Sequence, residues 1–422
     1  MNRGFYIIMA AQFFSSLADN ALLIVAISVL TASASPAWMT PMLKLFFVMS
    51  YVVLAPFVGA FADALPKGRV MFVTNLVKIA GCMMMFFSVH PLLAYAVVGF
   101  GAAAYSPAKY GILTELLPPE KLVAANGWIE GLTVLSIIFG TVLGGALVSE
   151  RFAAAINAML PVQHLELSIS LEIALGVVML SYLLAAAFNL RIPHTGAHYP
   201  AQEHHPIRLI ADFSRCFVAL WKDRLGQISL AVTSLFWGAG ATLQFIVLKW
   251  AERALNMPLA QGAILQGVVA FGVAFGAMAA ARRVPLKKSL TVMPLGLAMG
   301  IIVIVMTMVQ HVALAYPLLV LIGALSGYFV VPMNALLQHR GHVLMSAGHS
   351  IAVQNFSENA SILLMLGLYA LLVKLNLSVN IVIVLFGLFV AGIMWLVMKK
   401  HAANQREYDS LHLIGEQKHV GT

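Results

Sequence analysis

The residues of this sequence best placed to do chemistry are charged side chains within long apolar stretches. Asp19, Lys78, Lys109, Glu130 and Glu358 all occupy such positions. A charge inside a membrane span is costly unless it faces the protein interior or a water-filled cavity. These five residues are therefore expected to form ion pairs, to hold a polar ligand or to carry a proton.

Two of the carboxylates belong to polar stripes at helical spacing. Asp19 lies about 22 Å along its predicted helix and Glu358 about 20 Å along another, each counted from the inner end at a rise of ~1.5 Å per residue. The similar depths predict a polar pole in a central substrate cavity; the alternative is that each carboxylate caps a neighbouring helix within its own half of the chain. The first stripe comprises Gln12, Ser15, Ser16, Asp19 and Asn20, and the second comprises Ser350, Gln354, Glu358 and Ser361, flanked by Asn355 and Asn359.

The other buried charges have less specific surroundings. Lys109 and Glu130 lie at similar depths in two consecutive apolar stretches, and Asn126 shares a helix face with Glu130. A Lys109–Glu130 ion pair is the simplest expectation, with structural and substrate-binding roles equally open for both residues. Tyr105 shares a face with Lys109 and could line the same cavity. We expect Lys78 to be structural, although it could also bind a phosphate.

The segment between residues 59 and 69 has the spacing of a known loop signature. It has a glycine, an aspartate four residues later and then a basic-Gly-basic turn, and so it resembles the loop motif of the major facilitator superfamily. The aspartate can accept hydrogen bonds from helix N-termini and from basic side chains. The resemblance implies a conformational latch, and the alternative is an ordinary solvated turn. The residues concerned are Gly59, Asp63, Lys67, Gly68 and Arg69.

The composition shows what surrounds these residues. The chain of 422 residues is 61% hydrophobic and 10% charged, whereas soluble domains carry about 25% charged residues. The mean hydropathy is +0.92, so most of the surface must be solvated by lipid. The net charge of 25 − 16 = +9 comes mainly from short segments between apolar stretches, where basic residues set membrane topology. We therefore expect an integral membrane protein in a lipid bilayer, without a nucleic-acid partner.

Twelve apolar stretches are each long enough to cross a bilayer, which takes ~20 residues. They predict an all-α membrane protein with twelve transmembrane helices in two six-helix lobes, the fold of the major facilitator superfamily. With the N-terminus inside, the inner segments hold 18 Lys and Arg residues and the outer segments only Arg151, Arg253 and Lys374, which predicts cytoplasmic termini. The spans are expected near residues 4–32, 41–65, 70–88, 91–114, 122–149, 167–190, 228–252, 260–281, 289–309, 312–338, 345–373 and 377–398.

Two weakly similar halves organise the chain. Pro107 and Pro332 lie near the inner ends of the fourth and tenth predicted spans, as expected for a duplicated transporter. We predict an N-terminal lobe over residues 1–190, a cytoplasmic inter-lobe linker over 191–226, a C-terminal lobe over 227–398 and a cytoplasmic tail over 399–422. Four linker histidines lack a supporting carboxylate pattern, so we expect no metal site; they are His194, His198, His204 and His205.

Sequence motifs of other functional classes are absent. The chain has no GxxxxGK[ST] phosphate loop, no HxxxxD acyltransferase pair and no GxSxG nucleophile elbow. The sequence therefore favours a transporter over an ATP-driven pump or an enzyme, and we expect no cofactor.

Segments spread over nearly the whole chain resemble the lysophospholipid transporter (LplT) family of bacterial inner membranes. They read AQF at 11–13 with DNALL at 19–23, GAAAYSPAKYGIL at 101–113, FWGAG at 236–240, VVP with NALLQ at 330–338, and AVQN with EN at 352–359. The resemblance implies movement of lysophospholipids, chiefly lysophosphatidylethanolamine, from the outer to the inner leaflet. It also implies a separate acyltransferase partner that restores the second acyl chain. We expect a monomer in the inner membrane.

The resemblance suggests how such a substrate is held. Asp19 and Glu358 would bind the ammonium, helped by neighbouring amides, while Lys109 or Lys78 would bind the phosphate. Rocking of the two lobes would expose the site to each side in turn. One position departs from the family pattern, because Gln244 stands where relatives often have Arg; Lys249 or Lys44 would then have to supply that charge. The supporting amides are Asn20, Gln354, Asn355 and Asn359.

Two rival hypotheses remain open. One is a proton-coupled major facilitator exporter of drugs or amphiphiles, in which Asp19 or Glu358 would be the protonation site. The other is a lipid-modifying membrane enzyme. The direction of transport separates the exporter from the lysophospholipid transporter, and chemical change of the lipid identifies the enzyme.

Overall fold

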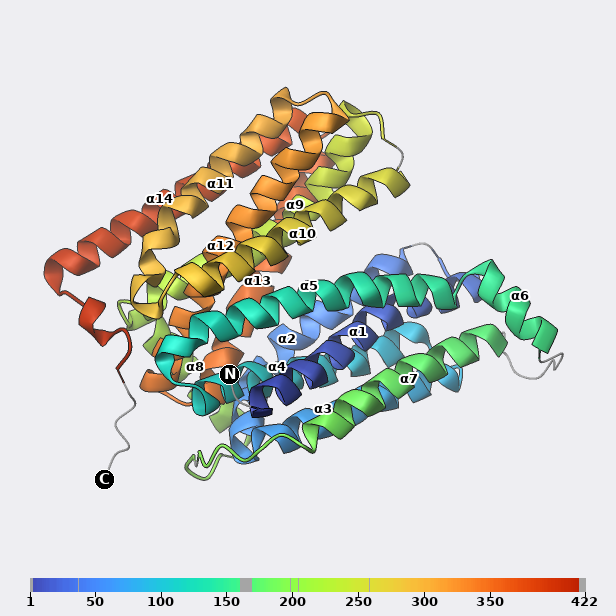
Figure 1. Ribbon diagram of the computed structural model, residues 1–422, viewed down its shortest axis with the longest axis horizontal. Helices are drawn as coiled ribbons and strands as arrows, with labels where there is room; N and C mark the ends of the chain where they lie inside the picture. Colours follow the sequence, from blue (N-terminus) through green and yellow to red (C-terminus); the bar gives the residue numbers. More distant parts are fainter. Residues whose placement is uncertain are drawn as a thin grey trace. The chain divides into compact units, whose positions relative to one another are not determined.

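The structure is a computed structural model that describes residues 3–36, 38–159, 169–197, 199–203, 205–257 and 259–416. These residues are almost entirely helical (Figure 1). The α-helices are α1 Arg3–Ala32, α2 Met39–Ala64, α3 Lys67–Phe86, α4 Pro91–Leu116, α5 Leu122–Leu147, α6 Glu150–Met159, α7 Ile169–Asn189, α8 Pro206–Lys222, α9 Gly226–Ala254, α10 Leu259–Arg283, α11 Met293–Val305, α12 Val312–Leu344, α13 Ala347–Lys374 and α14 Val379–Glu407. Short 3-10 helices are η1 Pro119–Lys121, η2 Leu286–Val292, η3 Met306–Met308 and η4 Leu411–Leu413.

Twelve helices in the described part of the chain are long and apolar enough to cross a membrane. The first of them, α1, has 30 residues and is therefore about 45 Å long, more than the ~30 Å of a hydrocarbon core. The short helix α11 forms a span together with the 3-10 turns on either side of it, over Leu286–Met308. Each predicted span overlaps one of the twelve helices, so the predicted all-α fold is confirmed.

Three helical segments were not predicted. Helix α6 follows the fifth span, α8 lies in the stretch predicted as a polar linker, and α14 continues to Glu407, beyond the predicted end of its span at residue 398. In α6 and at the end of α14, Ala, Lys, Arg, Gln and Glu form a helix readily in water although they lie outside the hydrocarbon. Helix α8 instead has apolar residues at helical spacing, which form one face of a surface helix.

The chain folds into two compact units. Unit 1 comprises Met1–Ile112, Leu135–Phe213 and Ala347–Ala352, and unit 2 comprises Leu113–Val134, Ser214–Ser346 and Val353–Thr422. Each unit thus includes a short piece of a helix whose remainder belongs to the other unit. The predicted boundaries of the lobes, linker and tail stay predictions.

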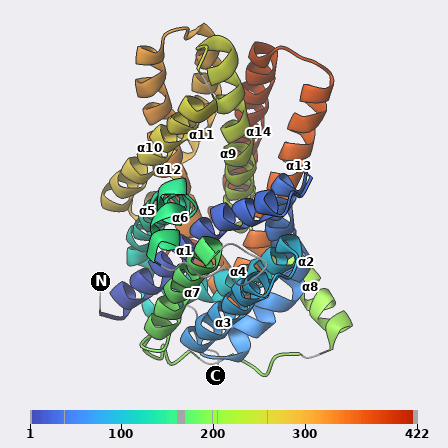
Figure 2. The same ribbon diagram turned by 90° about the vertical axis from the view of Figure 1, so that its right-hand side faces the viewer.

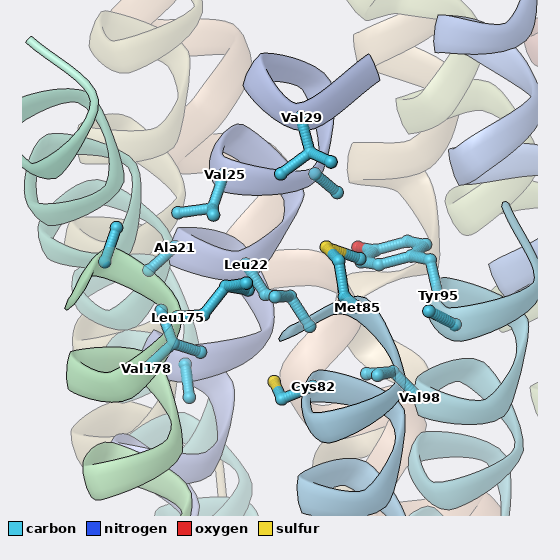
Figure 3. Close-up of a cluster of buried hydrophobic side chains, with 14 of the residues drawn as sticks. Ala21, Leu22, Val25, Val29, Cys82, Met85, Tyr95, Val98, Leu175 and Val178 are labelled. Atoms are coloured by element: carbon cyan, nitrogen blue, oxygen red, sulfur yellow. The ribbon is translucent and has the colours of Figure 1, made fainter. Parts of the chain in front are cut away.

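The core of unit 1 is built from α1, α3, α4 and α7. Leu22, Cys82, Val98 and Leu175, one from each of these helices, are fully buried and meet in one apolar cluster (Figure 3). Small residues bring α5 against α1, because a Cβ on Gly140 would lie 2.5 Å from a carbonyl oxygen of α1. The close helix packing that the glycines of α5 indicate is therefore present.

In unit 2, α9, α11, α12 and α14 pack together (Figure 2), and α10 packs along α12. The approach of α10 to α12 is very close. A Cβ on Gly276 would lie 1.9 Å from the Ala324 carbonyl oxygen, and one on Gly327 would lie 2.1 Å from the Val273 carbonyl oxygen. Glycines spaced four residues apart on both helices permit this backbone contact, as is common between helices in membranes.

Candidate functional site

The centre of the site in unit 1 is an ion pair between α1 and α3. The Lys78 ammonium nitrogen Nζ lies 2.8 Å from the Asp19 carboxylate oxygen Oδ2. The Tyr182 hydroxyl of α7 donates a hydrogen bond of 2.7 Å to the other oxygen, Oδ1. The Lys78 side chain is 1% exposed, whereas that of Asp19 is 19% exposed. Each oxygen of the carboxylate thus has a partner, and the carboxylate is the more accessible half of the pair.

Side chains of α1, α3 and α4 complete the surroundings of Lys78. Its Nζ also donates to Ser15 Oγ at 3.0 Å, and Ser15 Oγ donates to Asn75 Oδ1 at 2.8 Å. The Tyr105 ring centroid lies 5.0 Å from Nζ, within the range of a cation–π contact. The Tyr105 hydroxyl is buried and has no hydrogen-bond partner among the described residues. We call this set the Asp19 cluster: Ser15, Asp19, Asn75, Lys78, Tyr105 and Tyr182.

A second polar cluster lies in unit 2, around Glu358 of α13. Gln354 Nε2 donates to Glu358 Oε1 at 2.7 Å and to Asn334 Oδ1 of α12 at 3.2 Å. All three side chains belong to buried residues. The neighbouring Asn355 is also buried, and its backbone carbonyl accepts a hydrogen bond of 2.8 Å from Asn359 Nδ2. We call Asn334, Gln354 and Glu358 the Glu358 cluster.

Other residues predicted from the sequence have local contacts. Lys109 Nζ lies 4.1 Å from the centroid of the Tyr110 ring. Asn20 Nδ2 donates to the Ser16 carbonyl of its own helix at 2.7 Å. Glu130 is buried, with 4% of its surface exposed. The Lys109–Glu130 ion pair stays a prediction.

Asn126 forms a reciprocal amide pair with Gln338. Each side-chain amide donates to the oxygen of the other at 2.9 Å, and neither residue is more than 1% exposed. The pair joins the start of α5 in the first half of the chain to the end of α12 in the second half. Because both amides are buried, loss of either would leave the other without its partner.

Asp63, near the end of α2, has the kinds of partner that its motif predicts. Its Oδ1 accepts the Gly348 backbone N–H at 3.0 Å, and its Oδ2 accepts the His349 backbone N–H at 3.3 Å. These N–H groups belong to the first turn of α13, where a negative charge is favourable. His349 Nδ1 lies 2.9 Å from Oδ2, and Lys67 forms an ion pair with Oδ1. We call Asp63, Lys67, Gly348 and His349 the Asp63 cluster.

Two glycines permit the contact between α2 and α13. A Cβ on Gly348 would lie 2.6 Å from Asp63 Oδ1, and a Cβ on Gly59 would lie 3.0 Å from the backbone of His349. The motif glycine Gly68 approaches a different element, since its Cβ would lie 3.0 Å from the carbonyl oxygen of Asn189. Arg69 is exposed. Gly59 and Asp63, four residues apart on α2, therefore both contact the start of α13, a helix from the second half of the chain.

Sequence reasoning missed the partners of Asp19. Asp19 and Lys78 stand near the middle of α1 and α3, so their similar depth and opposite charge were a signal for pairing that could have been used. Tyr182 lies in an apolar stretch without a polar stripe, and nothing in the sequence distinguished it. Tyr105 shares a helix face with Lys109, as expected, and its ring also lies against Lys78, a contact that the sequence did not predict.

Unit 2 also contains a small apolar pocket between α9, α11, α12 and α14. Ser326 is the polar residue of its lining, and the Ser326 hydroxyl donates to the Ile322 carbonyl of its own helix at 2.7 Å. The lining includes Phe236, Leu243, Met299, Phe329, Phe386 and Met394.

Two further sequence predictions concern the linker histidines and Gln244. His198 and His204 lie outside the described residues, and within the described ones no three His, Cys, Asp or Glu side chains are grouped to hold a metal ion. The backbone carbonyl of Gln244 accepts a hydrogen bond from Gln266 Nε2 at 3.2 Å.

Solved structures share the fold at low sequence identity. A bacterial homologue of the iron transporter ferroportin in an outward-facing state has a TM-score of 0.72 and 13% identity, over 95% of this chain and 100% of that one. The Escherichia coli fucose:proton symporter FucP has a TM-score of 0.72 and 12% identity, over 94% of this chain and 98% of that one. These similarities concern the fold alone.

Sequence comparison identifies the family. A sequence model of the Major Facilitator Superfamily matches residues 8–364. Proteins of Yersinia enterocolitica serotype O:8 / biotype 1B and Pectobacterium carotovorum subsp. carotovorum, both named lysophospholipid transporter LplT, are 43% and 41% identical over 380 residues, which is 90% of this chain and 89% of each relative. The chain is therefore a multi-pass membrane protein that belongs to the major facilitator superfamily and, within it, to the lysophospholipid transporter LplT family.

Proposed function

We propose that this protein transports lysophospholipids such as lysophosphatidylethanolamine from the outer to the inner leaflet of a bacterial inner membrane. The observation that carries the proposal is the identity of 43% and 41% to two proteins named lysophospholipid transporter LplT, over 90% of the chain. The twelve-helix fold of a transporter superfamily supports it.

The Asp19 cluster has the charges that a zwitterionic head group needs. Lysophosphatidylethanolamine carries an ammonium and a phosphate, and Asp19 and Lys78 present one opposite charge to each. In our proposal the head group exchanges into this ion pair, with its ammonium on Asp19 and its phosphate on Lys78. Because a zwitterion replaces an internal ion pair, neither buried charge is left without compensation. The Tyr105 hydroxyl can donate a further hydrogen bond to the phosphate.

This proposal revises the expected phosphate ligand. Lys109 was the first choice on sequence grounds, but Lys78 is the cation that contacts Asp19 at 2.8 Å. Lys109 keeps a role as a second phosphate contact, and Asn20 as a contact beside Asp19. In unit 2, the Glu358 cluster with Asn355 and Asn359 offers further polar contacts. The small pocket of unit 2 offers an apolar lining for the end of an acyl chain.

The conformational cycle would use two of the contacts that join the halves of the chain. In alternating access, such contacts hold one state and must break to reach the other. The Asp63 cluster supplies a charged contact of this kind, and the Asn126–Gln338 pair supplies a neutral one. We propose that Gly59, Asp63, Lys67, Gly68 and Arg69 form the latch that the motif predicts.

The cellular setting follows from the same proposal. The asymmetry of Lys and Arg supports cytoplasmic N- and C-termini. A lysophospholipid delivered to the inner leaflet needs a second acyl chain, so a separate acyltransferase would act on it next. The protein itself would act as a monomer and would leave the lipid chemically unchanged.

Purified protein in proteoliposomes tests the assigned site. Asp19→Asn should abolish the protein-dependent uptake of labelled lysophosphatidylethanolamine. The matched control is Glu252→Gln, which removes the carboxylate of the exposed Lys249–Glu252 pair of α9, whose side chains are 46% and 52% exposed. Equal uptake by wild-type protein and a folded Asp19→Asn variant would contradict the role of Asp19. Export of dye from whole cells without lysolipid uptake would favour the proton-coupled exporter, and acylated product would favour an enzyme.

A further inference from the structure

Helix α8 presents three different faces, although it lies in a stretch predicted as a polar linker. One face packs on the protein. Phe213 and Leu220 are buried, and the Phe217 ring centroid lies 5.9 Å from that of Phe356 in α13. This face accounts for only part of the apolar surface of the helix.

The second face is an exposed apolar stripe. Ile207, Ile210, Val218 and Trp221 are 72%, 48%, 46% and 38% exposed. At about 100° of rotation per residue, these four positions fall within an arc of roughly 80°. The stripe therefore runs along one side of the helix as two exposed apolar pairs, with the exposed Ser214 between them.

The third face is a row of basic residues directly beside the apolar stripe. Arg208, Arg215 and Lys222 recur every seven residues along the helix. At about 100° per residue they share an arc of roughly 40°. Arg208 forms an ion pair of 3.1 Å with Glu203, which is a surface pair because its side chains are 74% and 30% exposed.

The C-terminal end of α8 is fixed to the start of a membrane-spanning helix. Asp223 follows α8 directly, and its Oδ1 accepts the backbone N–H groups of Leu225 at 3.2 Å and Gly226 at 2.7 Å. Arg340 of α12 donates to both Asp223 oxygens, at 3.2 and 2.7 Å. Helix α9 begins at Gly226 and is long and apolar enough to cross a membrane. A short, capped turn therefore holds α8 where α9 enters the bilayer.

We propose that α8 is an interfacial helix that binds the surface of an anionic bilayer. Its apolar stripe would lie among the outer parts of the acyl chains, and its basic row would contact anionic head groups. A basic row beside an apolar face with Trp is typical of helices that lie in this layer. The turn at Asp223 makes this location geometrically possible, because it joins α8 to the end of a membrane-spanning helix. This role does not depend on which molecule the protein transports.

Spin labels at two adjacent residues test the proposal in the full-length protein. In a Cys216→Ser background, Val218→Cys labels the apolar stripe and Ala219→Cys labels an exposed position about 100° away. Cys82 is fully buried and should not react. The measured quantity is the accessibility of each label to oxygen divided by its accessibility to a water-soluble nickel chelate. In vesicles of phosphatidylethanolamine and phosphatidylglycerol, we expect this ratio to be at least roughly threefold higher for the Val218→Cys label than for the Ala219→Cys label.

A second experiment varies the charge of the lipid. Each basic residue near an anionic surface strengthens binding about fivefold, so Arg215 and Lys222 together favour the bound state by about 25-fold. Arg208 adds to this only when it leaves Glu203. In phosphatidylcholine vesicles, we therefore expect nickel access at Val218→Cys to rise. Equal nickel access at both labels in anionic vesicles would overturn the proposal, as would exclusion of both reagents from Val218→Cys, which indicates a protein partner. Unchanged access in the two lipid compositions would contradict the anionic part.

Discussion

Neutralising Asp19 alone should destabilise the protein more than replacing both Asp19 and Lys78 by uncharged residues. Asp19→Asn leaves a lysine whose side chain is 1% exposed without its carboxylate, and removal of one partner of a buried pair costs about 3–5 kcal/mol. Lys78→Met should cost less, about 1–2 kcal/mol, because the Asp19 side chain is 19% exposed and keeps its Tyr182 hydrogen bond. The double variant should cost only about 1 kcal/mol, since no buried charge is left alone.

The difference between these variants is measurable as a coupling energy. The values above give a coupling of at least ~3 kcal/mol (3 + 1 − 1), within the range of about 1.5–7 kcal/mol found for close charge pairs. The assay is reversible unfolding of the purified protein in mixed micelles, with Glu252→Gln as the control for removing the carboxylate of an exposed ion pair. The reasoning is refuted if the two single costs simply add in the double variant. An equal cost of the two single variants would contradict the effect expected from their different exposure.

Three further predictions concern contacts elsewhere in the described structure. Gly276→Ala should lower the unfolding free energy by about 1–3 kcal/mol, because its Cβ would lie 1.9 Å from a carbonyl oxygen of α12. Gly267→Ala, on the same helix, should not lower it, because a Cβ at this position would meet no atom within 4 Å. Gly348→Ala should speed hydrogen exchange in the first turn of α13 by pushing away the Asp63 carboxylate, and Gly367→Ala in the same helix should not; equal exchange in both would contradict the proposed contact. Tyr182→Phe should cost about 1 kcal/mol of unfolding free energy through the lost hydrogen bond, and an unchanged value would show that this bond is not formed.

The membrane spans could be predicted because they depend on local sequence. Each span requires about 20 largely apolar residues, and this requirement does not involve neighbouring helices. The segments that were missed lack this local signal. Helix α8 and the end of α14 are helical outside the apolar stretches, and polarity alone does not mark the end of a helix there.

The candidate site could be predicted only in part. Position along a helix gives the depth of a charge, so Asp19, Lys78 and Glu358 were recognised as unusual. Depth does not tell which helices are neighbours or which way each side chain points. The pairing of Asp19 with Lys78 requires α1, α3 and α7 to pack around one point, and this packing depends on apolar side chains far apart in the sequence. Asp63 was easier, because its motif and its glycine spacing belong to one short segment.

The most direct test of lysophospholipid transport compares one-chain and two-chain lipids in proteoliposomes. Labelled lysophosphatidylethanolamine is added from outside, and the fraction protected from extraction by albumin is followed with time. We predict that wild-type protein speeds the protection of intact lysophosphatidylethanolamine over protein-free vesicles, that diacyl phosphatidylethanolamine is not moved, and that Asp19→Asn abolishes the effect. Protection at the rate of protein-free vesicles, with folded wild-type protein present, would contradict lysophospholipid transport by this protein.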